Sequence, residues 1–129
     1  MIIAGRGAKL SKAREAIEEM AEAMGALLTT SLQAKGLFTG NRFAMDISGA
    51  YASDFARERF AEADLVIGLG VGLGAYTTES GYLYPGAQTV QIDIGPRGLW
   101  QGLRTADLHI RADAKAAAEA VTAAIKRHG

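Results

Sequence analysis

The sequence contains no cysteine, only two prolines and no excess of charge of either sign. Without cysteine the chain has no disulfide framework, thiol nucleophile or cysteine-ligated metal, and a cytoplasmic protein is the simplest interpretation. Its 14 lysine and arginine residues balance 14 aspartate and glutamate residues, so no net field attracts a phosphate backbone or an anionic membrane surface. We therefore expect neither nucleic acid nor a membrane among its partners.

Long apolar runs are also missing. The longest, such as Leu65–Leu69, are far below the roughly 18 residues that are needed to cross a bilayer. Apolar residues make up 49% of the chain and charged residues 22%, which is typical of a soluble globular protein and unlike a disordered one. The length of 129 residues fits a single domain over 1–129.

Segments of strand length alternate with helical patterns along the chain. These segments occupy residues 1–4, 26–30, 65–69, 88–94 and 108–112. Apolar residues at helical spacing predict helices over 11–24, 53–63 and 113–128, with Ser11, Ser53 and Asp113 as N-caps and Gly25 as a left-handed stop. This alternation predicts an α/β domain whose parallel sheet is covered on both faces.

Residues 31–52 interrupt this pattern. Glycines at 36, 40 and 49 separate short apolar pieces, so we expect mostly loop there, with room for one short helix. The first strand begins at Met1 without a charged leader before it. A strand at that position suggests a piece excised from a longer protein. Trp100 follows Pro96 and Gly98, where we expect it to plug a core or an interface.

The first glycine motif is Gly5-Arg6-Gly7, where the first strand turns toward a helix. Backbone N–H groups at such a turn can receive a phosphate. The dinucleotide fingerprint requires a third glycine three residues after the second, and Leu10 stands there. A tight turn whose glycines only satisfy backbone geometry is therefore the alternative to a phosphate site.

The second motif, at residues 68–74, is the better cofactor candidate. It follows a strand, and Asp93 ends the next strand at close to the spacing of the fingerprint's ribose-binding acid. Leu73 stands at the third fingerprint position, and residues 75–85 contain Gly81 and Pro85 where a long crossover helix is expected. Close packing of strand and loop at the edge of the sheet is the alternative.

Catalytic and metal-binding patterns are not recognisable. His109 and His128 are far apart and lack neighbours typical of metal ligands. Ser48 and Ser80 each precede a glycine, but neither lies in a nucleophile elbow. We therefore assign no catalytic residue and no metal ligand.

The order of the motifs resembles the central domain of thiamine-diphosphate-dependent enzymes such as acetolactate synthase and benzoylformate decarboxylase. The resemblance rests on IIAGRGA at 2–8, the helix after it, LTTSLQAKG at 28–36, ADLVIGLG at 63–70, QIDI at 91–94 and ADA at 112–114. It covers nearly the whole chain. It implies a three-layer Rossmann-like domain with a parallel sheet of about six strands.

In that family the central domain lies between two thiamine-binding domains, which hold thiamine diphosphate and Mg²⁺. The family's activating glutamate and its GDG metal motif belong to those neighbours, and this chain has no GDG triplet. The resemblance therefore implies that this domain is inactive alone. Its role is to space the catalytic domains and to contribute to subunit contacts in a homo-oligomeric lyase or transferase, which decarboxylates or joins 2-keto acids.

Some members of the family bind FAD or ADP in this domain. The matching positions here are Gly5, Gly7, Thr30, Ser31, Leu32, Gly70, Gly72, the rest of residues 70–78, and Asp93. The flavin-binding members carry two arginines and acids after the second glycine motif, where this chain has Gly72, Gly74, Ala75 and Tyr76, and they carry a second acid where it has Gly95.

Each lost charge-assisted hydrogen bond costs about 1.5–3 kcal/mol, so two or three losses turn a micromolar binder into a millimolar one. We therefore expect that no cofactor is tightly bound and that FAD is not retained. Two other functions stay open. One is a free-standing nucleotide-binding module for FAD, ADP or NAD that uses residues 68–74 and Asp93. The other is a small hydrolase or transferase, for which no nucleophile and base are visible.

Overall fold

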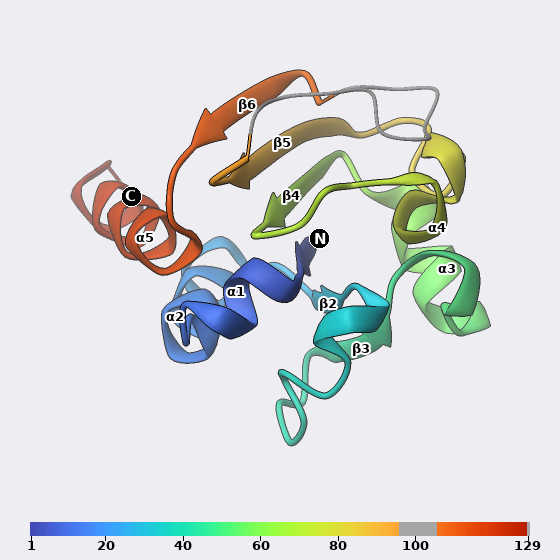
Figure 1. Ribbon diagram of the computed structural model, residues 1–129, viewed down its shortest axis with the longest axis horizontal. Coiled ribbons are helices and arrows are strands. Elements are labelled where there is room, and N and C mark those ends of the chain that lie inside the picture. The colour runs from blue at the N-terminus through green and yellow to red at the C-terminus, as the bar shows by residue number, and fades with distance from the viewer. Residues whose placement is uncertain (96–105, 129) are drawn as a thin grey trace.

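Six parallel strands form one sheet in the computed structural model, which describes residues 1–95 and 106–128 (Figure 1). The strands are β1 (Ile2–Ala4), β2 (Leu28–Thr30), β3 (Ala44–Ile47), β4 (Leu65–Leu69), β5 (Gln88–Asp93) and β6 (Leu108–Arg111). They lie in the order β3-β2-β1-β4-β5-β6. The chain thus builds outward from β1 to β3, then returns to place β4 on the other side of β1. This reversal is a topological switch point, where α/β proteins bind ligands.

Helices connect the strands and cover both faces of the sheet. The α-helices are α1 (Arg6–Leu10), α2 (Arg14–Met24), α3 (Asp54–Glu62), α4 (Ala75–Thr78) and α5 (Ala114–His128). Three 3₁₀-helices are η1 (Leu32–Ala34), η2 (Gly49–Tyr51) and η3 (Glu79–Gly81). In Figure 1, α1, α2 and α5 gather on one side and α3 and α4 on the other. The predicted α/β class and the parallel, Rossmann-like sheet are therefore confirmed.

The alternation of side chains along β1 divides the core into two halves. Ile2 packs with Ile17 of α2 and Ala118 of α5, whereas Ile3 packs with Phe60 of α3 on the opposite face. These side chains are fully buried. Burial of one isoleucine or phenylalanine side chain contributes about 1.5–3 kcal/mol. An apolar run was the correct sign of burial on both faces for residues 65–69. The same prediction for residues 108–112 is wrong, because β6 is an edge strand of half-buried and exposed residues.

The prediction that residues 31–52 are mostly loop is wrong in part. They contain η1, β3 and η2. β3 is an edge strand of only half-buried and exposed residues, and its pairing with β2 shifts register between Leu28 and Thr30. Asp46, inside it, has a positive φ of 60°. β3 forms because it pairs with β2, and its own residues show no strand pattern.

The predicted N-cap at Ser11 is also wrong. Residues 6–10 form the separate helix α1, and Ser11 follows it, donating its hydroxyl to the Ala8 carbonyl oxygen at 3.3 Å. Lys12 then reverses the chain with a φ of 57°, and α2 starts at Arg14. The helix cannot begin at Ser11 because that residue completes the preceding turn.

The other predicted helix ends are confirmed. Ser53 accepts a hydrogen bond from the Ala56 amide at 3.1 Å, and Asp113 accepts one from the Ala116 amide at 2.9 Å. Gly25 ends α2 with a φ of 69°. Trp100, predicted as a core or interface plug, lies outside the described residues. No helix in the described part of the chain is long and apolar enough to cross a membrane.

Candidate functional site

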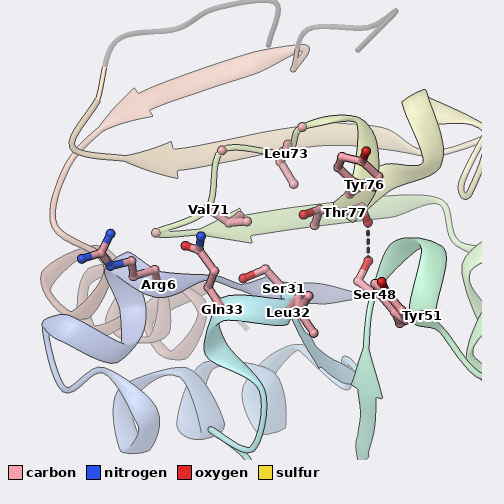
Figure 2. A pocket seen from close by; sticks show the side chains of 13 residues that line it. Arg6, Ser31, Leu32, Gln33, Ser48, Tyr51, Val71, Leu73, Tyr76 and Thr77 are labelled. Atoms are coloured by element: carbon pink, nitrogen blue, oxygen red, sulfur yellow. Dashed lines mark hydrogen bonds between the residues drawn. The ribbon is translucent and has the colours of Figure 1, made fainter. Parts of the chain in front are cut away.

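A cavity of about 570 Å³ opens at the carboxyl ends of the central strands, beside the switch point between β1 and β4 (Figure 2). Its walls come from α1, η1, η2, α4 and the loop that follows β4. The lining residues are Arg6, Ser31, Leu32, Gln33, Ser48, Tyr51, Gly70, Val71, Gly72, Leu73, Gly74, Tyr76 and Thr77. This volume lies in the range of small-molecule sites.

The two glycine motifs touch each other beside this cavity. A Cβ atom on Gly5 would lie 2.5 Å from the carbonyl oxygen of Gly70, and one on Gly70 would lie 2.3 Å from the amide nitrogen of Ala8. Gly70 also has a φ of 62°, which residues with a side chain rarely adopt. The close-packing interpretation thus accounts for the glycines at 5, 7 and 70.

The two glycine amides of the first motif, and those of Ala8 and Lys9 after it, are occupied within the protein. Gly5 donates to the carbonyl oxygen of Leu69 at 3.0 Å and Gly7 to that of Gly70 at 2.9 Å, while Ala8 and Lys9 both donate to that of Gly5. These four N–H groups already have acceptors and are not free to hold a phosphate. The tight-turn interpretation accounts for this motif.

The loop of residues 70–74 is held at its base and open at its tip. Gly70 donates to the Ile92 carbonyl oxygen at 2.7 Å, and the buried Gln91 side chain donates its Nε2 to the Val71 carbonyl oxygen at 3.0 Å. Within residues 1–95 and 106–128, the amides of Gly72, Leu73 and Gly74 have no acceptor. Backbone N–H groups that line a cavity without a partner can donate to a ligand.

The opposite wall is braced by contacts between η2 and α4. Ser48 donates its hydroxyl to the Thr77 carbonyl oxygen at 2.8 Å (Figure 2). Arg57 donates to Glu79 and to the carbonyl oxygens of Gly49 and Ala50. The hydrogen bond to Glu79 raises the pKa of Arg57 above its ordinary value, against partial desolvation. This network fixes the segments that present Tyr51 and Tyr76.

A second hollow of about 260 Å³ lies beyond the ends of β5 and β6. Gly70 lines both this hollow and the main cavity and lies between them. Gly7, Gly70 and Asp93 line the second hollow, together with Asp113. Asp113 is already engaged as the N-cap of α5. Asp93 thus lines the second hollow, whereas the tip of the 70–74 loop lines the main cavity.

The predicted cofactor residues are thus distributed over several sites. Ser31, Leu32, Gly70 and Gly72 line the main cavity, and Gly7, Gly70 and Asp93 line the second hollow. Gly5 is buried beneath the loop. Thr30 lines a third hollow of about 200 Å³ beside β3, and its buried hydroxyl has no partner among the described residues. Their cofactor role stays a prediction.

The described lining of the main cavity carries positive charge and no negative charge. Among the described residues that line it there is no aspartate or glutamate, and Arg6 is the charged side chain. Arg6 is exposed and forms no ion pair within the described residues. The sequence analysis did not assign Gln33, Ser48 and Tyr51 to the cofactor site, because they come from the region predicted as mostly loop and lie outside the two glycine motifs.

The donor set does not fit a divalent metal. Within residues 1–95 and 106–128 no group of three His, Asp or Glu side chains could hold a metal ion. Mg²⁺ requires carboxylate or phosphate oxygens, and the cavity wall offers none. These residues therefore do not form the magnesium site of a thiamine enzyme.

Comparison with known proteins agrees with the resemblance seen in the sequence. The family model for the central domain of thiamine pyrophosphate enzymes matches residues 1–121. The probable acetolactate synthase large subunit of Methanocaldococcus jannaschii is 31% identical over 117 residues, and the acetolactate synthase large subunit of Buchnera aphidicola subsp. Schlechtendalia chinensis is 31% identical over 120 residues. Each match covers 89% of this chain but only 20% of the relative. The chain belongs to the family of thiamine pyrophosphate enzyme central domains.

Proposed function

We propose that this domain is a non-catalytic spacer within a larger thiamine-diphosphate enzyme, which decarboxylates or joins 2-keto acids. The observation that carries the proposal is the family match over residues 1–121, together with relatives of which this chain spans only 20%. The remaining length of such a protein is available for the thiamine-binding domains. In this proposal those domains hold thiamine diphosphate and Mg²⁺, as the resemblance to the family implies.

The first experiment reads the coding sequence on both sides of this segment. We expect an upstream domain with a glutamate on a buried strand and a downstream GDG motif with an asparagine after it. A stop codon directly after Gly129, with no upstream domain in frame, would contradict the spacer function. A cytoplasmic location belongs to the same proposal, because the chain has no cysteine for disulfides.

The second experiment tests the lack of activity. The purified 129-residue chain is incubated with thiamine diphosphate, Mg²⁺ and pyruvate, beside an acetolactate synthase as a positive control. We expect neither release of carbon dioxide nor carboligation from the chain alone. Turnover by the chain that survives further purification would overturn the proposal.

Subunit and domain contacts are the structural part of this role. Exposed aromatic side chains gather on the segments around α3 and α4: Tyr51, Phe55, Tyr76 and Tyr82 are all more than half exposed. Exposed apolar surface of this kind favours association. We expect the isolated chain to form dimers in sedimentation experiments, and a strictly monomeric profile at high concentration would count against this.

A free-standing nucleotide-binding module is the second candidate. The position of the cavity at the switch point favours it, as do the backbone amides of Gly72 and Gly74, which have no acceptor among the described residues. Calorimetric titrations with ADP, NAD and FAD test it. Stoichiometric micromolar binding would support the module, whereas we expect millimolar or weaker binding and a colourless protein after purification, because charged partners for the pyrophosphate are few.

A further inference from the structure

We propose that a groove beside α2 binds a basic amphipathic helix of another protein. The groove is lined by α2, by the start of β2 and by the residues before β3, and it measures about 830 Å³. It lies at the amino ends of these two strands, whereas the main cavity lies at the carboxyl ends of the sheet. This inference goes beyond the spacer function and does not depend on it.

Part of the groove lining is apolar. The apolar lining residues are Ala21, Ala26, Leu27, Leu28 and Phe43. The side chain of Phe43 is 51% exposed, and the guanidinium carbon of Arg42 lies 5.2 Å from the centre of its ring. An exposed aromatic ring beside other apolar residues provides a surface against which the apolar side of a partner can pack.

The α2 side of the groove is acidic. The lining glutamates are Glu15, Glu18, Glu19 and Glu22, which share one face of the helix. Arg14 pairs with Glu18 at 3.0 Å, whereas the other three form no ion pair within residues 1–95 and 106–128. Arg42 is the cation among the described lining residues. The groove therefore carries net negative charge, which complements a basic partner and repels nucleic acid and anionic membranes.

This arrangement of acids lowers the stability of the isolated helix. Glutamates three and four residues apart on one helix repel each other. Glu22 lies in the last turn of α2, which has no basic residue, and the carboxyl end of a helix disfavours negative charge. A local violation of this kind is expected where a surface serves binding and not folding. Cations of a bound partner would relieve the repulsion.

The spacing of the acids indicates the form of the partner. Glu15 and Glu22 are seven residues apart, which is about 10 Å along a helix axis. A helix that lies alongside α2 matches them with lysines or arginines at the same three- and four-residue spacing, while its apolar side faces Leu27 and Phe43. No helix in the described part of this chain carries three cations at that spacing. The partner is therefore not a second copy.

The experiment uses two synthetic peptides of about 20 residues, long enough to form a helix. The first carries three lysines at the spacing of Glu15, Glu19 and Glu22 beside a row of leucines, and the second carries glutamates in place of the lysines. Fluorescence anisotropy measures their binding to the 129-residue chain, and NMR shift changes locate it. We expect saturable binding of the basic peptide, with shift changes at Leu27 and Phe43, and no binding of the acidic peptide.

Charge reversals separate the groove from the charge of the whole protein. Glu22→Lys should weaken the basic peptide by about tenfold, because an attractive pair is replaced by a repulsive one. Glu119→Lys is the matched control, since Glu119 is an exposed acid of α5 that does not line the groove, and it should leave the affinity unchanged. Phe43→Ser should weaken the peptide by about fivefold, because the partner no longer buries the exposed part of the ring.

Thermal unfolding provides a second readout. Glu22→Lys should unfold at a higher temperature than the wild type, because it removes repulsion and places a cation at the carboxyl end of α2. A lower unfolding temperature would make this acid structural and would overturn the proposal. The proposal also fails if the basic peptide does not bind, or if Glu119→Lys weakens it as much as Glu22→Lys does. Self-association of the wild type that Glu22→Lys abolishes would place a second copy in the groove instead.

Discussion

Gly7 donates its backbone N–H to the carbonyl oxygen of Gly70 at 2.9 Å, and a Cβ on Gly7 would lie 2.9 Å from the Cα of Gly70. The turns that follow β1 and β4 are therefore in direct backbone contact at the switch point. This contact closes the space between the main cavity and the second hollow, both of which Gly70 lines. It explains the glycines at 5, 7 and 70 without requiring a ligand.

Replacement of Gly70 tests this contact. Gly70→Ala would place a Cβ 2.3 Å from the Ala8 nitrogen at a φ of 62°, and we expect a loss of at least about 3 kcal/mol in the free energy of unfolding. Gly72→Ala is the matched control, because a Cβ there meets no atom within 4 Å. It should change stability by less than about 0.5 kcal/mol. Urea unfolding measures both, and equal effects would refute the packing role.

Gln91 holds the base of the same loop. Gln91→Leu keeps the side chain's bulk but leaves the Val71 carbonyl oxygen without its donor, which should cost about 1–3 kcal/mol. Thr89→Val on the same strand is the comparison, since the buried Thr89 hydroxyl has no partner among the described residues. That change should be neutral or stabilising. Thermal unfolding of the two variants measures both effects. An unchanged stability in Gln91→Leu would show that the hydrogen bond from Gln91 to Val71 does not stabilise the fold.

Replacement of Ser53 and of Ser11, which both stand before helical patterns in the sequence, should change stability by different amounts. Ser53→Ala removes an N-cap that accepts from the Ala56 amide, and we expect it to cost about 1 kcal/mol. Ser11→Ala removes only a 3.3 Å bond after α1 and should cost less than about 0.5 kcal/mol. Chemical denaturation compares them. A larger effect at Ser11 would mean that it contributes to the start of α2 after all.

In the isolated 129-residue chain, the amino group of Met1 makes the stability depend on pH. Burial lowers the pKa of the Met1 amino group below its ordinary value, and the charge of Asp64 opposes this in part. The folded state therefore binds this proton less tightly than the unfolded state. Stability should be lowest below the folded pKa and should rise as the pH increases to about 8 and above, where both states are neutral.

Urea midpoints measured from about pH 7 to about pH 9 should increase accordingly. Asp64→Asn removes the opposing charge, so the increase should become larger. Acetylation of the amino group removes the titrating group and should abolish the increase. An acetylated chain with the same slope would assign the effect to another residue.

Most of the sheet could be predicted from the sequence, and the reasons are local. The run at 65–69 is apolar throughout, and the Ser53 and Asp113 caps stand directly before helical patterns. The edge strand β3 could not be predicted in this way. Its residues are half-buried or exposed, so their pattern carries no periodic signal. It exists because β2 presents an unpaired edge.

The site shows the same division. The sequence by itself determined the fold class, the two glycine turns and the family, because apolar periodicity and motif order are properties of the chain. Only the tertiary structure decided what surrounds the turns. It occupied the amides of Gly5 and Gly7, separated Asp93 from the main cavity, and brought Tyr51 from η2 to the same cavity as Arg6 from α1. Those neighbours are far apart in sequence, and only the order of the strands places them at one edge of the sheet.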